Sequence, residues 1–143
     1  MSVVEYAVLK DNGELIFFET NSSYSNNSTG TFEDISGNSY VGRLFANFSN
    51  RTFSSYSDVP WYSVRSSIRT INIANGSTIT PIDCSYWFYN CSSCTLIDLS
   101  RLNTANVTSL AKMFYGCTSV TSLNISGWNT SNVTTMDSTF AGM

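Results

Sequence analysis

Residues 96–108, with the sequence LIDLSRLNTANVT, are followed 26 residues later by SLNISGWNTSNVT at residues 122–134. The Asn-Thr and Asn-Val-Thr steps fall at the same places in both copies, and Ile97, Leu99 and Val107 align with apolar residues. Internal repeats with a period of roughly 20 to 50 residues are the signature of solenoids and related arrays. The chain is therefore predicted to contain a fold built from stacked repeats.

The 26-residue register extends in both directions and defines three repeats. Residues 92–117 align with residues 118–143, and residues 66–91 form a degenerate first copy in which the Asn-Thr segment is missing and Pro81 is present instead. A single repeat cannot bury its own apolar face, so such units are stable only when they stack, usually with at least three copies. The predicted organisation is an amino-terminal unit at 1–65 followed by repeats at 66–91, 92–117 and 118–143.

Each repeat carries two apolar patterns. The alternation at Ile97 and Leu99 predicts a short strand whose alternate residues enter the core. Farther along, Val107, Leu110 and Phe114 follow one another at spacings of three and four, which predicts one or two helical turns. The predicted fold class is α+β: a right-handed solenoid of the leucine-rich-repeat type, with parallel strands backed by short helices.

Residues 1–65 lack the repeat and are expected to form two β-hairpins. Strands are predicted at 3–9 and 14–19, around an Asn-Gly pair that favours tight hairpin turns, and at 30–35 and 40–45. Terminal repeats need a cover for their apolar edge. This β-hairpin cap is expected to cover the first repeat with its aromatic residues Phe17, Phe18, Phe32, Phe45 and Phe48. An independent binding module is the alternative interpretation.

Several residues recur at one place in each repeat and are expected to stack into structural ladders. They are the aromatic Phe88, Phe114 and Phe140, the small Cys91 and Cys117, and the polar Asn106 and Asn132. Both Asn residues also begin Asn-x-Thr triplets, which are glycosylation acceptors in secreted eukaryotic proteins. A hydrogen-bonded ladder explains the recurrence more simply, because short polar side chains bond readily to nearby backbone groups.

The sequence Cys91-Ser92-Ser93-Cys94 has the spacing of zinc and redox motifs. A zinc site would need Cys84 and Cys117 as its other ligands, because the chain contains no His. All four cysteines fall on apolar positions of the register, where a free thiol behaves as a small hydrophobic side chain. Buried thiols are therefore predicted ahead of a disulfide or a metal site, and no metal or cofactor is expected.

Residues 96–108, together with the closing MFYGC at 113–117, resemble the BspA-like leucine-rich repeat of bacterial surface proteins, which is also found in the Mycoplasma lipoprotein-type repeat group. The third copy, with Trp128 and Phe140, is similar, and Met143 replaces the closing Cys. The resemblance implies an adhesive or protein-binding solenoid from a bacterium or its phage, without cofactor or catalytic residues. It implies a place outside the cell, at the cell surface or on a virion, although the first residues show no export signal.

The composition narrows the function classes. The net charge of −3 and the scattered Lys and Arg argue against a nucleic-acid partner. No apolar run approaches the roughly 20 residues that cross a bilayer, so no membrane insertion is expected. Without His and without a motif of paired carboxylates, no enzyme is expected, and the acidic residues are predicted to be solvated. The remaining enzymatic alternative is a carbohydrate-active enzyme, for which Asp98 would be the residue to test.

The candidate binding surface is the outward column of the predicted strands. Its neutral to acidic, hydroxyl-rich character suits a protein or glycan partner. The column consists of Thr70, Asn72, Leu96, Asp98, Ser122 and Asn124. A second hypothesis is a self-assembling structural subunit, a homo-oligomer that stacks end to end through the exposed edge of the third repeat.

Overall fold

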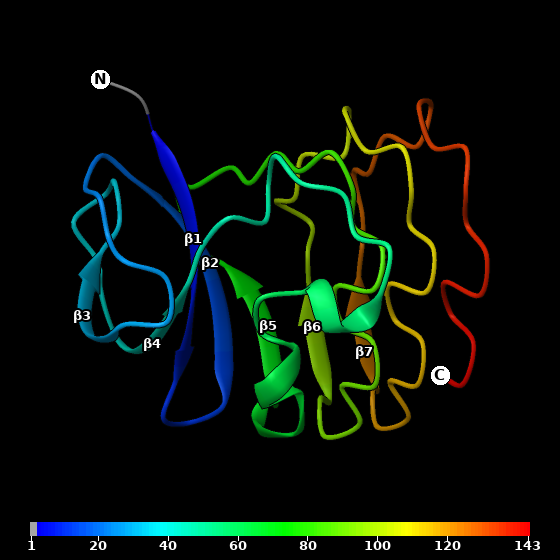
Figure 1. Ribbon diagram of the computed structural model, residues 1–143, viewed down its shortest axis with the longest axis horizontal. Coiled ribbons are helices and arrows are strands. Elements are labelled where there is room, and N and C mark those ends of the chain that lie inside the picture. Colours follow the sequence, from blue (N-terminus) through cyan, green and yellow to red (C-terminus); the bar gives the residue numbers. More distant parts are fainter. Residues whose placement is uncertain (1–2) are drawn as a thin grey trace.

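Seven strands form one mixed sheet in the computed structural model, which describes residues 3–143 (Figure 1). The order across the sheet is β3-β4-β1-β2-β5-β6-β7. The strands are β1 (Val4–Lys10), β2 (Glu14–Thr20), β3 (Thr29–Glu33), β4 (Ser39–Phe45), β5 (Thr70–Ile73), β6 (Leu96–Asp98) and β7 (Ser122–Asn124). Two 3₁₀ helices, η1 (Tyr56–Asp58) and η2 (Tyr62–Ser67), precede β5, and the described residues contain no α-helix. The protein is therefore mostly β.

Both predicted hairpins are confirmed. Strands β1 and β2 pair antiparallel around a turn in which Gly13 adopts a φ of 88° and its N–H donates to the carbonyl of Lys10. Strands β3 and β4 form the second hairpin, and β4 pairs with β1. The sequence did not reveal that β2 pairs parallel with β5, which joins the amino-terminal hairpins and the repeats into one sheet.

The predicted repeat strands are also confirmed. Strands β5, β6 and β7 pair in parallel with a shift of one repeat, so that Ile71 lies beside Ile97 and Ile97 beside Leu123. Their side chains face the main core, which extends from the hairpins to Cys117. In Figure 1 the repeats follow one another from β5 toward the C-terminus.

The aromatic residues of the cap divide between two cores, which corrects one expectation. Phe17, Phe45 and Phe48 pack on the first repeat as predicted, and the ring of Phe17 stacks on Trp87 at 5.5 Å. Phe18 and Phe32 instead lie in a second core on the other face of the sheet. The reason is the strand alternation, which sends neighbouring residues such as Phe17 and Phe18 to opposite faces.

The helical turns predicted behind the strands are wrong. Residues 107–114 and their counterparts form successive turns instead, in which alternate N–H groups bond three residues back, as from Met113 to Leu110. The intervening N–H groups bond to the next repeat, as from Lys112 to Asp137, so they are not free to form a helix. Lys112 also has a φ of 56°, outside the helical region. We call this layer of turns, residues 84–91, 110–117 and 136–143, the turn wall.

No helix among residues 3–143 combines the length and the apolar character needed to cross a bilayer.

Candidate functional site

The six residues predicted as a binding surface lie together on the outward face of β5–β7, which we call the strand face. Register pairs Thr70 with Leu96 and Leu96 with Ser122 in one row. Asp98 pairs with Asn124 in the next row, which Asn72 begins in β5. Leu96 is 44 % exposed, so an apolar side chain lies in solvent between two hydroxyl residues.

The second row of the strand face has a structural task as well. The side-chain Oδ1 of Asp98 accepts from the N–H (3.1 Å) and the hydroxyl (2.7 Å) of Ser100. Asn124 accepts in the same way from the N–H of Ser126 at 3.0 Å. The bonds from Ser100, assisted by the charge of Arg101, lower the pKa of Asp98. Because these bonds close the turn after the strand, the second row presents side chains in fixed orientations.

Residues 38–40, which lead into and begin β4, lie beside the β5 end of the strand face. An open hollow of about 400 Å³ lies there, lined by Tyr40, Asn72 and neighbouring residues. The hydroxyl of Tyr40 donates to Asp34 at 2.6 Å, and burial together with this bond raises the pKa of Tyr40 above its usual range. Tyr40 is therefore held uncharged, in a fixed position beside the strand face.

The Phe ladder forms between the repeats. The ring of Phe88 lies 6.0 Å from Phe114, and Phe114 lies 5.7 Å from Phe140, with interplanar angles of 23° and 14°. At the amino-terminal end Trp61 stacks on Phe88, with its indole N–H donating to the carbonyl of Trp87 at 2.6 Å. The ladder therefore begins under an aromatic cover.

A second aromatic column, missed from the sequence, lies beside the Phe ladder. Tyr56 stacks on Tyr89 at 5.0 Å, and Tyr89 stacks on Tyr115 at 4.9 Å. Tyr89 and Tyr115 are one repeat apart, which is a signal that could have found this pair. Tyr56 is out of register because it comes from η1, so only the fold could add it.

The predicted Asn ladder is present in one of its two steps. Asn132 donates from Nδ2 to the carbonyl of Ala105 at 2.7 Å. The corresponding acceptor for Asn106 would be the carbonyl of Ile79, which accepts instead from the N–H of Asn103 at 2.8 Å. The side chain of Asn106 is exposed and makes no hydrogen bond within residues 3–143.

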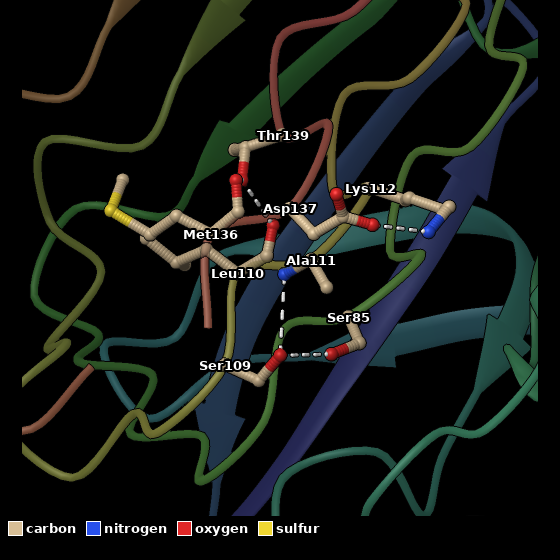
Figure 2. Close-up of polar contacts among 8 residues, drawn as sticks. All are labelled: Ser85, Ser109, Leu110, Ala111, Lys112, Met136, Asp137 and Thr139. Carbon is tan, nitrogen blue, oxygen red and sulfur yellow. Dashed lines mark hydrogen bonds and ion pairs between the residues drawn. The ribbon is translucent and has the colours of Figure 1, made fainter. Parts of the chain in front are cut away.

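Side chains of the turn wall, and of Ser109 just before it, connect neighbouring repeats (Figure 2). Lys112 and Asp137 form an ion pair at 2.8 Å, and Ser85 and Ser109 share a hydrogen bond at 2.6 Å. The buried hydroxyl of Thr139 lies 2.8 Å from the carbonyl of Leu110. Lys112 and Asp137 are in different positions of the register, so sequence alignment could not pair them.

All four cysteines are free and buried in the main core, where the register places them. Burial raises the pKa of Cys94 to about 11 and that of Cys117 to about 12, and it also raises those of Cys84 and Cys91 well above the usual value of a thiol. The thiols are therefore protonated at neutral pH. Within the described part of the chain, no group of three or more Cys, Asp or Glu side chains is placed to hold a metal ion.

Two carboxylates contradict the expectation that the acidic residues are solvated. Asp34 and Asp83 are buried. Asp83 accepts from the N–H groups of Phe53 and Ser85, both at 2.8 Å, and so joins the cap to the first repeat. Burial raises the pKa of Asp34, but hydrogen bonds from Tyr40 and from loop N–H groups outweigh burial and leave the pKa lowered. Bonds of this kind compensate the cost of burying the charge.

The fold and these surfaces define a β-rich repeat protein. Residues 82–143, which comprise the second and third repeats and the end of the first, match the family described as "Mycoplasma protein of unknown function, DUF285". No curated protein and no solved structure matches the chain.

Proposed function

We propose that this protein is a non-catalytic recognition module of the BspA-like leucine-rich-repeat type, a right-handed solenoid that binds a protein or glycan partner through its strand face. The observation that carries the proposal is the row Thr70, Leu96 and Ser122, which is fixed in register by the parallel sheet and in which Leu96 and Ser122 are exposed and Thr70 is half-buried. An exposed leucine between hydroxyl groups offers an apolar contact with hydrogen-bonding groups on either side. Such a mixture suits a protein surface or the faces of a sugar.

The borders of the strand face support the same proposal. The second row, Asp98 and Asn124, is held by bonds to the following turns, so binding would not have to order these side chains. The hollow beside Tyr40 and Asn72 adds a concave edge to an otherwise flat surface. Binding without a cofactor at the cell surface, in the extracellular space or on a virion is the role that we assign to this face.

Array binding tests the proposal. The full chain is applied to a glycan array and to an array of extracellular proteins, and any bound member is then titrated with wild type, Leu96→Lys and Ser122→Lys. Both lysines place a long charged side chain on the strand face and are expected to weaken binding at least tenfold. Ser131→Lys, at an exposed turn away from the strand face, is the matched control and should bind as wild type.

Two outcomes would count against this function. One is a partner whose affinity is the same for Ser122→Lys and Ser131→Lys, which would place the contact elsewhere. The other is turnover of a bound glycan that is lost in Asp98→Asn, which would make the protein an enzyme.

A further inference from the structure

The backbone hydrogen bonds across the turn wall all point in one direction. N–H groups of each repeat donate to carbonyls of the next, over distances of 2.7 to 3.1 Å. In the first repeat the donors are Cys84, Tyr86, Phe88 and Asn90, and in the second they are Leu110, Lys112, Phe114 and Gly116. A normal strand edge presents both donors and acceptors. The turn wall instead has a direction, with N–H donors on one edge and carbonyl acceptors on the other.

The third repeat therefore ends in a row of donors. The equivalent N–H groups, those of Met136, Ser138, Phe140 and Gly142, have no acceptor among residues 3–143. Every carbonyl from residue 135 to residue 141 already accepts a bond, either from the second repeat or from within its own turn. We call these four N–H groups the donor edge.

Apolar side chains surround the donor edge. Met136, Phe140 and Met143 are 51 %, 43 % and 44 % exposed. One face of the Phe140 ring stacks on Phe114. A partner that covers these side chains also removes the four N–H groups from water, and each N–H left without an acceptor would cost about 1–3 kcal/mol. The occupant must therefore supply a row of carbonyls as well as apolar surface.

A second copy of this chain does not meet that requirement. A two-fold arrangement that lays wall on wall would oppose donors to donors. A head-to-tail arrangement would need the acceptor edge of the first repeat, which the cap covers: Trp61 donates to the carbonyl of Trp87, and Tyr56 stacks on Tyr89. The polarity of the wall thus opposes end-to-end self-assembly.

We propose that the donor edge binds a segment of the same 26-residue repeat type whose own acceptor edge is uncovered. The carbonyls of such a segment repeat with the spacing seen at Ser109, Ala111, Met113 and Tyr115, which accept from the first repeat. Its aromatic residue in the register position of Phe114 stacks on Phe140. This site is separate from the strand face and is independent of what the strand face binds.

The probe is a synthetic peptide with the sequence of residues 92–117, titrated into the full chain. The expected result is 1:1 binding, with hydrogen exchange at the N–H groups of Met136, Ser138, Phe140 and Gly142 slowed at least tenfold at saturation. A peptide of the same composition in scrambled order should have no effect.

A pair of variants isolates the donor contribution. Met136→Ala and Met136→Pro both remove the side chain, but only Pro removes the N–H. Thr135, which precedes it, lies in an extended bridge that a following Pro tolerates. Met136→Pro should bind the peptide about five- to tenfold more weakly than Met136→Ala, as expected for the loss of one hydrogen bond. Phe140→Ala, which keeps its N–H, should weaken binding of the peptide at least fivefold. This variant tests the site if the proline variant is unfolded.

Three results would overturn the proposal: no binding of the peptide, exchange protection confined to other surfaces, or equal binding of the peptide by the wild type and Phe140→Ala. Concentration-dependent dimers of the chain without peptide, with the donor edge protected, would show that a second copy is the occupant.

Discussion

The two ends of the repeat stack differ although they are built from the same register. Phe88 and Phe140 occupy equivalent positions, yet Phe88 is fully buried and Phe140 is 43 % exposed. The first is covered by Trp61 and neighbours from the cap, and the second has a stacking partner on one face. In a stack where each repeat contacts only its neighbours, the stabilisation of a residue depends on how many neighbours its repeat has.

The same contrast holds for the whole repeat. Within the described residues no apolar side chain after Cys117 is fully buried, whereas the first repeat buries Trp87, Phe88 and most of its other apolar residues. The cap adds a further difference, because it also packs a second core on the opposite face of the sheet. Stability is therefore concentrated where the cap meets the first repeat, and the third repeat is the place for local opening.

The largest expected effect separates the two ends of the Phe ladder. Phe88→Ala removes a buried ring and should lower the free energy of unfolding by about 3–5 kcal/mol. Phe140→Ala removes a ring that is already half in water and should cost about 1 kcal/mol. Urea denaturation of both variants at neutral pH measures the difference. Equal losses would mean that the two ends are equally packed in solution.

A smaller effect is expected at two glycines of the turn wall. Gly116 and Gly142 are one repeat apart and both have positive φ, 74° and 79°. A Cβ on Gly116 would lie 2.1 Å from Oδ1 of Asn90, whereas a Cβ on Gly142 would meet only the backbone of Gly116 at 3.4 Å. Gly116→Ala should therefore cost about 2 kcal/mol, and Gly142→Ala about 1 kcal/mol from the backbone conformation alone.

A second substitution that removes the Asn90 side chain tests whether its contact with residue 116 causes the loss of stability. Asn90 itself has a φ of 57°, which glycine adopts without strain. Asn90→Gly combined with Gly116→Ala should recover most of the difference between the two glycine variants. If the double variant is no more stable than Gly116→Ala, the loss does not come from the contact between repeats.

The strands were predictable because their signal is local. Alternation marks Ile97 and Leu99 as inward, and the 26-residue offset places Leu123 beside Ile97. The turn wall was not predictable from spacing, because apolar residues three and four apart fit both a helix and a series of turns. The outcome depends on where the N–H groups of Lys112 and its neighbours find acceptors, which is a property of the next repeat.

The candidate surfaces divide in the same way. The strand face followed from the register alone, since residues one repeat apart must lie side by side on parallel strands. The Tyr56–Tyr89 contact and the carboxylate of Asp83 depend on residues 51–58, which have no repeat and whose path is set by tertiary packing. Sequence patterns show which residues are equivalent but not which segment covers them.

The smallest expected effect concerns Glu5, whose carboxylate joins the cap to the first repeat by hydrogen bonds. We call the end of the stack that the cap covers the closed end. Its carboxylate accepts from the hydroxyl of Ser49 and from the N–H of Thr80 at 3.1 Å. Burial raises the pKa of Glu5, and these hydrogen bonds offset only part of the increase. The stabilisation from its protonated form is therefore complete below the pKa of the unfolded chain and is lost as pH rises through the folded pKa.

Glu5→Gln keeps an oxygen acceptor but cannot ionise. Relative to wild type, the variant should gain melting temperature as pH is raised from 4 to 7, because only wild type loses stabilisation from Glu5 over that range. Glu33→Gln, at an exposed position of β3, is the matched control for the loss of one ionisable carboxylate. A decreasing difference for Glu5→Gln would mean that the hydrogen bonds to the ionised carboxylate outweigh its burial, so that the charged form of Glu5 stabilises the closed end.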